Sequence, residues 1–374
     1  MKFGVGVIGA TGYIGTPYRA EIRDATYDAT IVALCARRRD LLEAAGREDS
    51  ASLVTSDWRE VIEHPDVNLI VVATPDALHY EEVMAAVEAG KHVFCDKPVA
   101  MNAAEAYKMW AACRDAGLGH YVPFWTRYIE CFVRAKEIVE SGMLGEIRGI
   151  VCRWHNNRPA SIPFTWRDNA ELSAAGSIGD VGSHAYDTAR WITGYEAKRV
   201  VAHAGTFSPP KPDMGEPNLG EAIQWGETHS EGDSQDVRAA TSFDFGDIAI
   251  EFENGAVGSI MSSHAPFLRK GLAPDMELHG TEASLAIDRL KNELTIARTG
   301  QETRLLEKVD DHGMGNRFSH FVFPALRERV NSGQSEHPGL DDGWRVQMFV
   351  DAAVLSAKQG RWVELAELNA ENHG

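Results

Sequence analysis

The residues whose types best suit chemistry are a lysine and a histidine, each in a short and distinctive stretch. Lys97 lies in "GKHVFCDKPVA", between an apolar run and Pro98. His184 lies in "GSIGDVGSHAYDTARWITG", shortly after Asp180. An ammonium group can stabilise a developing alkoxide, and an imidazole that titrates near neutral pH can carry a proton. Together the two side chains suit the oxidation of an alcohol, which must lose a proton and a hydride.

The first 122 residues alternate between apolar strand-like runs and helical runs. We expect strands at 3–8, 30–36, 69–73 and 92–95, and helices at 16–25, 80–89 and 103–116. This alternation predicts a Rossmann-type parallel sheet with helices on both faces. Lys97 would then lie at the carboxyl edge of the sheet, where ligands bind in such folds. Proline fixes its own φ angle, so Pro98 would hold the backbone beside the lysine in place.

The rest of the chain has a different rhythm. Short alternating stretches between turn residues predict antiparallel hairpins. Strands are expected at 147–154, 239–245, 248–252, 256–262, 276–279, 285–287 and 294–297, and helices at 129–141, 317–332 and 343–358. We therefore predict an α/β protein with a Rossmann domain over residues 1–122 and an α+β domain with a large, mostly antiparallel sheet over residues 123–374. Residues 204–236, rich in Pro, Gly and acidic residues, are expected to form a long loop.

The local sequence predicts how His184 is presented. Ser183 is a plausible N-cap and Gly194 a plausible end of a helix, so His184 would lie in its first turn. Asp187 would lie on the same face. It could orient His184 or pair with Arg190, and the sequence does not decide between the two.

Three glycines follow the first expected strand. Gly9, Gly12 and Gly15 have one residue more between the first two than the common dinucleotide motif. Glycines at such a turn let a pyrophosphate approach the amino end of a helix. A purely structural turn is the alternative, but the order strand, turn, helix, strand favours a dinucleotide site.

The end of the second expected strand bears on the choice of dinucleotide. An NAD enzyme usually has Asp or Glu here to accept from the ribose 2′-hydroxyl. This chain has Ala36, followed by Arg37, Arg38 and Arg39. Guanidinium groups suit a 2′-phosphate in charge and geometry. We therefore favour NADP(H), with NAD(H) as the other possibility. The alternative is that the arginines only begin a solvated basic helix.

Composition excludes several classes of protein. The formal charge of −18 argues against a nucleic-acid partner or an anionic membrane surface. No apolar run approaches the length that spans a bilayer, so we expect no membrane association. The five cysteines are widely spaced, without the close pairs typical of zinc or redox sites. We expect buried thiols, no metal and a cytoplasmic location.

Several motifs together resemble the Gfo/Idh/MocA family, the glucose–fructose oxidoreductase and inositol dehydrogenase type. The matching stretches are "TPDALH" at 74–79, "AGKHVFCDKP" at 89–98 and "DVGSHAYD" at 180–187, besides the glycine turn and the C-terminal "PGLDDGWRVQMFVDAAVLSAKQGRWVEL". The resemblance covers nearly the whole chain. This chain departs from the family pattern with Asp96 for the usual Glu, the longer glycine turn and the basic end of the second strand.

The resemblance implies roles for individual residues. Lys97, His184 and Asp180 would be catalytic, with Asp180 also binding substrate hydroxyls. The bond between Lys97 and Pro98 is often cis in the family. The cofactor would be held by a larger set: Gly9, Thr11, Gly12, Tyr13, Ile14, Arg37, Arg38, Thr74, Pro75, His79 and Lys97.

The resemblance also implies a substrate class and an assembly. The family acts mostly on sugars, cyclitols and their glycosides, and the C-terminal half looks like the branch that acts on anhydrosugars and glycosides at a ring hydroxyl. Aromatic faces pack on sugar rings, and polar groups take the hydroxyls. Besides Asp180 and His184, candidates for these contacts are Trp125, Arg127, His155 and Trp166. We expect an unphosphorylated sugar or polyol as substrate, and a homodimer or homotetramer.

Two other functions remain open from the sequence. "GATGYIG" also resembles the glycine turn of semialdehyde and acyl-phosphate reductases, which act through a cysteine thioester. No cysteine has an evident catalytic setting. The other possibility is a non-catalytic dinucleotide sensor, which would leave Lys97 and His184 dispensable.

Overall fold

A computed structural model describes residues 1–368 except 216, 231, 233, 235 and 268–271. The chain forms two compact units. Unit 1 comprises residues 1–123, 218–221 and 314–345; unit 2 comprises residues 124–217, 222–313 and 346–374. The domain boundary expected after residue 122 stays a prediction.

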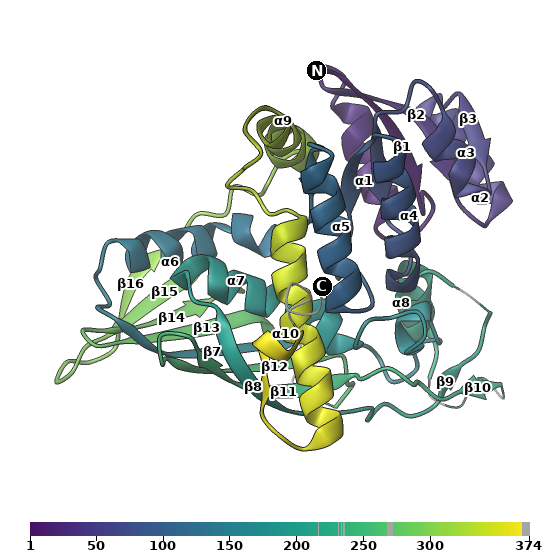
Figure 1. Ribbon diagram of the computed structural model, residues 1–374. Coiled ribbons are helices and arrows are strands. Elements are labelled where there is room, and N and C mark those ends of the chain that lie inside the picture. The colour runs from purple at the N-terminus through teal and green to yellow at the C-terminus, as the bar shows by residue number, and fades with distance from the viewer. Residues whose placement is uncertain (216, 231, 233, 235, 268–271, 369–374) are drawn as a thin grey trace. The chain divides into compact units, whose positions relative to one another are not determined.

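Unit 1 contains a six-stranded parallel sheet with the order β3-β2-β1-β4-β5-β6 (Figure 1). The strands are β1 (Phe3–Ile8), β2 (Ala29–Cys35), β3 (Leu53–Thr55), β4 (Leu69–Val72), β5 (His92–Cys95) and β6 (His120–Tyr121). The helices are α1 (Gly15–Asp24), α2 (Arg39–Asp49), α3 (Trp58–Glu63), α4 (Asp76–Glu88), α5 (Ala103–Asp115), the π-helical turn η4 (Phe318–Val322) and α9 (Phe323–Ser332). The predicted Rossmann-type sheet is confirmed. Every residue of β4 is buried, because helices cover both faces of the sheet.

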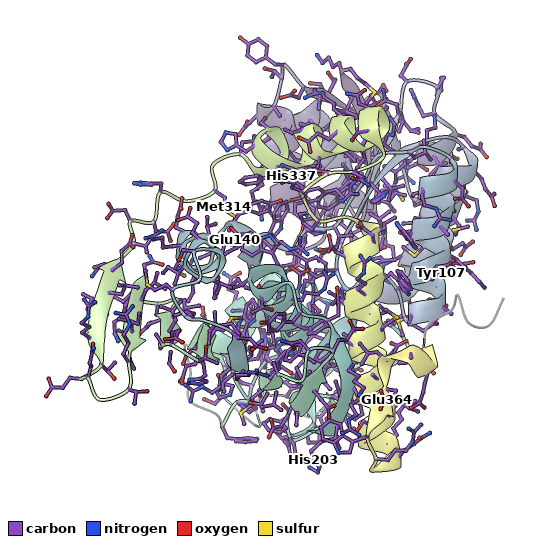
Figure 2. All side chains as sticks on the ribbon, turned by 60° about the vertical axis from the view of Figure 1, so that its left-hand side comes forward. Tyr107, Glu140, His203, Met314, His337 and Glu364 are labelled. Atoms are coloured by element: carbon purple, nitrogen blue, oxygen red, sulfur yellow. The ribbon has the colours of Figure 1, made fainter. Side chains whose placement is uncertain are left out.

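Aromatic rings join residues 314–345 to the sheet of unit 1. The ring of Phe94 on β5 stacks on Phe318 at 5.1 Å, and Phe3 on β1 stacks on Phe323 at 5.1 Å. At the start of α10 (Leu340–Gln359), the ring of Trp344 meets that of Tyr107 from α5 edge-on, with 5.1 Å between their centres. Figure 2 labels Tyr107. These contacts explain why a segment so late in the chain belongs to unit 1.

Unit 2 is built on a nine-stranded sheet with the order β16-β15-β14-β13-β7-β12-β11-β8-β17. Its strands are β7 (Ile147–His155), β8 (Ala197–Gly205), β11 (Phe245–Phe252), β12 (Val257–Ser263), β13 (Leu272–Gly280), β14 (Ser284–Asp288), β15 (Glu293–Ala297), β16 (Arg304–Lys308) and β17 (Val363–Glu364). The sheet is mostly antiparallel, as predicted, but β7 and β12 run parallel. Helices α6 (Glu130–Glu140) and α7 (Ser183–Thr193) pack on one face (Figure 1).

Two of the expected elements are wrong. Residues 239–244 form no strand, and β11 runs without a break from Phe245 to Phe252. Gly246 lies within this strand and has a packing role: a Cβ there would lie 2.5 Å from the side chain of Ile178, so glycine lets the π-helical turn η3 (Ile178–Gly182) pack on the strand. The expected loop 204–236 contains β9 (Lys211–Pro212) and α8 (Leu219–Thr228).

Candidate active site

The glycine turn of unit 1 is tight and directly links β1 to α1. Gly9 has a φ of +84°, and a Cβ there would collide with the carbonyl oxygen of Ala73. The amides of Gly9 and Ala10 both donate to the carbonyl of Cys35 at 3.0 Å, which ties the end of β1 to the end of β2. A Cβ on Gly15 would collide with the carbonyl of Gly9. This geometry fits a dinucleotide, since backbone and not side chains fills the turn.

The other predicted residues of this segment, Thr11, Tyr13 and Ile14, directly precede α1. In the described chain, no side chain caps this helix at Ile14. The side chain of Tyr13 is 44% exposed. Gly12 donates its amide to the carbonyl of Gly9 at 3.0 Å, so Thr11 lies within the turn. A helix start without a side-chain cap is suited to receive an anion.

The ends of β4 and β5 are held together by His79. Its Nε2 lies 3.0 Å from the carbonyl oxygen of Thr74, and its Nδ1 lies 3.0 Å from that of Pro98. The ring is fully buried, and desolvation lowers the pKa of His79. Pro75 precedes α4 directly. His79 therefore fixes the backbone near two predicted cofactor residues and does not reach solvent itself.

Lys97 follows β5 at the carboxyl edge of the sheet. The Lys97–Pro98 peptide bond is cis. The amide of Lys97 donates to Oδ1 of Asp96 at 2.9 Å, and the hydroxyl of Tyr18 donates to the same oxygen at 3.4 Å. The lysine side chain is half-buried. Asp96 thus links the backbone of Lys97 to α1.

The arginines after β2 differ in their surroundings. Ala36 is buried, Arg37 is exposed and Arg38 is half-buried. Nη1 of Arg38 lies 2.8 Å from Oε1 of Glu221, which belongs to the same unit. Of the arginines that follow the second strand, Arg38 is therefore in an ion pair with a carboxylate from far along the chain.

In unit 2, His184 is the second residue of α7 and is 9% exposed. Its ring meets Phe124 edge-on at 5.9 Å and lies 5.5 Å from that of Trp154 on β7. The prediction that Ser183 caps the helix is wrong, because Ser183 has helical angles and continues the turn η3. Its hydroxyl donates to the carbonyl of Asp180 at 2.9 Å. Gly194 ends α7 with a φ of +75°, as predicted.

Two side chains that were not singled out from the sequence lie beside the carboxylate of Asp180. Nη2 of Arg158 lies 3.3 Å and Nε2 of His264 lies 3.0 Å from the same oxygen, Oδ2. Burial, with the charge of Arg158 adding to it, lowers the pKa of His264 to about 4. At neutral pH His264 is therefore an uncharged partner of the carboxylate.

The parallel pair β7–β12 explains this convergence. His155 at the end of β7 pairs with Ser263 at the end of β12. The pairing continues beyond the strands, since the amide of Arg158 donates to the carbonyl of His264 at 3.1 Å. The polar stretches "HNNRP" and "SSHAP", which begin in the last residues of the two strands, gave the available signal, but using it required knowing that the strands are parallel neighbours.

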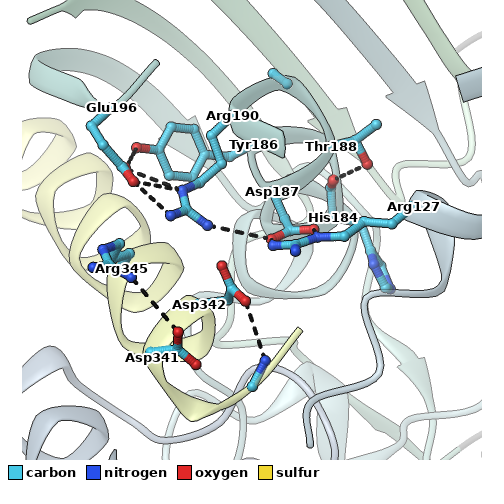
Figure 3. A network of polar contacts seen from close by, with 12 residues as sticks. Arg127, His184, Tyr186, Asp187, Thr188, Arg190, Glu196, Asp341, Asp342 and Arg345 are labelled. Carbon is cyan, nitrogen blue, oxygen red and sulfur yellow. Dashed lines mark hydrogen bonds and ion pairs between the residues drawn. The ribbon is translucent and has the colours of Figure 1, made fainter. Parts of the chain in front are cut away.

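Asp187 lies between two arginines (Figure 3). Arg127 donates to it from Nε at 2.8 Å and from Nη2 at 2.5 Å. Nη1 of Arg190 lies 3.8 Å away, and Arg190 also pairs with Glu196. Arg127 and Asp187 are both buried. Arg127 is thus engaged in an ion pair, whereas we expected it to contact substrate.

The remaining predicted substrate residues lie in the same unit. Trp125 begins the short helix η1 (Trp125–Tyr128), and Trp166 begins η2 (Trp166–Asp168) with the guanidinium of Arg167 at 4.3 Å from its ring. His155 is 8% exposed. Their contacts with substrate stay predictions, as do the roles of all the site residues.

The cysteines are poorly suited to catalysis. All five are free and buried, as predicted. Desolvation raises the pKa of Cys35, Cys113 and Cys152 to about 12 and that of Cys131 to about 11, and the pKa of Cys95 also rises. A thiol nucleophile acts as the thiolate. These surroundings give no support to a cysteine-dependent reductase.

Comparisons with known proteins identify the family of this chain. Residues 3–124 match the family model for an oxidoreductase family with an NAD-binding Rossmann fold, and residues 132–286 match the Gfo/Idh/MocA C-terminal domain. The chain belongs to the Gfo/Idh/MocA oxidoreductase family. The resemblance seen in the sequence motifs is confirmed, and so is the expectation of an oxidoreductase.

Individual members of the Gfo/Idh/MocA family match over most of the chain. A levoglucosan dehydrogenase of Pseudarthrobacter phenanthrenivorans is 31% identical, covering 88% of this chain and 88% of its own. A myo-inositol 2-dehydrogenase of Thermotoga maritima is 27% identical, covering 97% and 99%. A solved levoglucosan dehydrogenase in complex with NADH and levoglucosan aligns with a TM-score of 0.79 at 26% identity, covering 98% of this chain and 100% of that one.

Within the described residues, no helix is both long and apolar enough to cross a membrane.

Proposed function

We propose that this family member is an NAD(P)-dependent dehydrogenase that oxidises a ring hydroxyl of an unphosphorylated sugar, anhydrosugar, glycoside or cyclitol to a ketone, and catalyses the reverse. One structural observation carries the proposal. The tight glycine turn follows β1, and Lys97 follows β5, so both lie at the carboxyl edge of one parallel sheet. That edge is where doubly wound sheets bind ligands. The named activities of the relatives support the substrate class.

The residues of the chain would divide the chemistry as follows. When bound, the nicotinamide cofactor accepts or donates the hydride. His184 takes the hydroxyl proton, and the ammonium of Lys97 stabilises the negative charge on the oxygen. Asp180 binds a substrate hydroxyl and helps to tune both groups. Arg127 would support α7 through Asp187 and would act by positioning.

For the cofactor we propose NADP(H) as the favoured dinucleotide, with NAD(H) also accepted. The support is the exposed Arg37, the nearby Arg38 and the absence of an acidic side chain at Ala36. The glycine turn, with Thr11, Tyr13 and Ile14, would hold the pyrophosphate. Thr74 and Pro75 would contact the cofactor, and His79 would hold them in place.

We also propose a homodimer or homotetramer in the cytoplasm. Helices α6 and α7 cover one face of the nine-stranded sheet, and Val257 on β12 is 59% exposed. A second copy would pack on the opposite face of the sheet. Five free cysteines suit a reducing compartment.

The experiment that tests the function is a dehydrogenase assay at 340 nm with NADP⁺ and with NAD⁺. The substrates are levoglucosan, myo-inositol, a methyl glucoside and glucose 6-phosphate. We expect NADP⁺ or NAD⁺ to be reduced with at least one of the unphosphorylated ring compounds and not with glucose 6-phosphate. Tight binding of a dinucleotide without turnover of any ring polyol would instead favour a non-catalytic sensor.

A further inference from the structure

A carboxylate from a remote part of the sequence lies beside Arg38, just after the end of β2. Nη1 of Arg38 lies 2.8 Å from Oε1 and 2.9 Å from Oε2 of Glu221. The two residues are 183 positions apart, and both belong to unit 1. Their side chains are 37% and 43% exposed. An ion pair this exposed contributes little to stability, so it can open for a ligand.

The backbone at the start of α8 holds Glu221 in place. The amide of Asn218 donates to Oε2 of Glu221 at 2.9 Å, and the amide of Glu221 donates to Oδ1 of Asn218 at 3.0 Å. Since α8 begins at Leu219, Asn218 is the N-cap residue and Glu221 the third helical residue. This reciprocal arrangement is a capping box. The carboxylate beside Arg38 is therefore fixed by a helix start.

The same segment lies against the glycine turn. A Cβ on Gly220 would lie 3.3 Å from Cδ2 of Tyr13. Tyr13 follows β1 and Arg38 follows β2, and these strands are neighbours in the sheet. Residues 218–221 thus contact both places where a dinucleotide is expected, the turn that receives its pyrophosphate and the strand end that receives its adenosine ribose.

A carboxylate in this position has opposite effects on the two dinucleotides. It can accept a hydrogen bond from a ribose 2′-hydroxyl, as the acidic residue after the second strand does in NAD enzymes. It repels a 2′-phosphate and competes with it for the guanidinium. Ala36 leaves the usual acidic position without such a group.

We propose that Glu221 is a cofactor-specificity residue. Its carboxylate, which comes from far along the chain, supplies the acidic group that favours NAD(H). It also offsets the positive charge by which Arg38 favours NADP(H). The inference rests on the proposed function only in that the chain binds NAD or NADP. Such a residue would let one site accommodate both dinucleotides.

The test compares dissociation constants of NADP⁺ and NAD⁺, measured by calorimetry, for the wild type and Glu221→Gln. Glutamine also serves at the third position of a capping box, so the substitution removes charge and retains the helix start. The matched control is Glu43→Gln, which removes the same charge from the neighbouring exposed pair with Arg39. We expect the ratio of the constants to shift toward NADP⁺ by roughly tenfold in Glu221→Gln and by less than about twofold in the control.

A double-mutant cycle shows whether Glu221 acts through the arginine. In an Arg38→Gln background, the gain in NADP⁺ affinity from Glu221→Gln should be smaller than in the wild type, because only the direct repulsion of the 2′-phosphate then remains to be removed. An unchanged ratio in Glu221→Gln, or a shift equal to that of the control, overturns the inference while leaving the dinucleotide site intact. Failure of the wild type to bind either dinucleotide contradicts the proposed function itself. Thermal unfolding of each variant verifies that all are folded.

Discussion

His264 places its Nε2 atom 3.0 Å from a carboxylate oxygen of Asp180, and burial keeps the ring uncharged at neutral pH. The folded protein protonates this histidine only near its lowered pKa of about 4, whereas an unfolded chain does so near 6.5. Between these values the unfolded state binds more protons, so the free energy of unfolding falls as the pH falls from about 6.5 to 4. We expect His264 to account for about 3 kcal/mol of that loss.

Urea unfolding of the wild type and His264→Gln at pH 7, 5.5 and 4.5 measures this effect. Other buried histidines, such as His120, contribute a similar slope in both proteins, so the difference between the two isolates His264. If the unfolding free energy of the two proteins depends on pH in the same way, His264 is not neutral in the folded state.

A buried acid next to a predicted cofactor residue has the opposite pH dependence. Glu82 is buried, accepts a hydrogen bond from Thr74 at 2.7 Å, and desolvation raises its pKa to about 8. The folded state therefore binds more protons than the unfolded state between about pH 4.5 and 8, and stability falls as the pH rises through this range. The wild type should therefore lose a few kcal/mol of unfolding free energy over this pH range, and Glu82→Gln should not show that loss.

The measurement is the unfolding free energy at pH 5 and pH 8.5. Glu81→Gln is the control, because Glu81 is the preceding residue but pairs with Arg59 on the surface. If Glu82→Gln and Glu81→Gln show the same pH dependence as the wild type, Glu82 is ionised in the folded state.

Breaking the buried ion pair between Arg127 and Asp187 should lower the free energy of unfolding strongly. Asp187→Ala leaves a buried guanidinium without its main counter-charge, which typically costs about 3–5 kcal/mol. The exposed pair Lys136–Glu140 offers a control, and Glu140→Ala should cost less than about 1 kcal/mol. Denaturant unfolding measures both.

A double variant separates charge from packing at this pair. Arg127→Met with Asp187→Leu leaves neither charge alone, so it should recover part of the stability lost in Asp187→Ala. A double variant less stable than Asp187→Ala would mean that the pair is held by shape and not by charge.

The catalytic roles predict distinct kinetic losses. His184→Asn should lower kcat by about 10²–10⁴-fold, because the hydroxyl proton loses its acceptor. Lys97→Ala should lower kcat by up to about 10³-fold, the equivalent of roughly 4 kcal/mol of charge stabilisation. Steady-state kinetics with the responding polyol checks both. The exposed residues Lys108 and His203 provide controls, and Lys108→Ala and His203→Asn should retain wild-type turnover.

The parallel half of the fold could be predicted well from the sequence, for a physical reason. Strands buried on both faces have continuous apolar runs, so β4 and β5 were placed almost to the residue. The antiparallel half was harder, because two strands were expected at 239–245 and 248–252 where one strand runs from Phe245 to Phe252. Gly246 lies inside that strand, where the absence of a Cβ makes room for Ile178.

The candidate site shows the same limit. Lys97 and His184 stand in motifs and were singled out from the sequence, whereas Arg158 and His264 were not. Those two meet Asp180 only because β7 and β12 are parallel neighbours, and strand order cannot be read from local patterns. Glu221 was missed because its helix begins within a stretch whose glycines and prolines suggested a loop.

The capping box at the start of α8 has a consequence for how this protein can evolve. The third position of a capping box accepts Glu or Gln, and the codons for the two differ by a single base. The charge beside Arg38 can therefore be removed in one mutational step that leaves the hydrogen bonds of the helix start in place. Lineages that carry this helix would be able to change their balance between the two dinucleotides without first changing the glycine turn or the sheet.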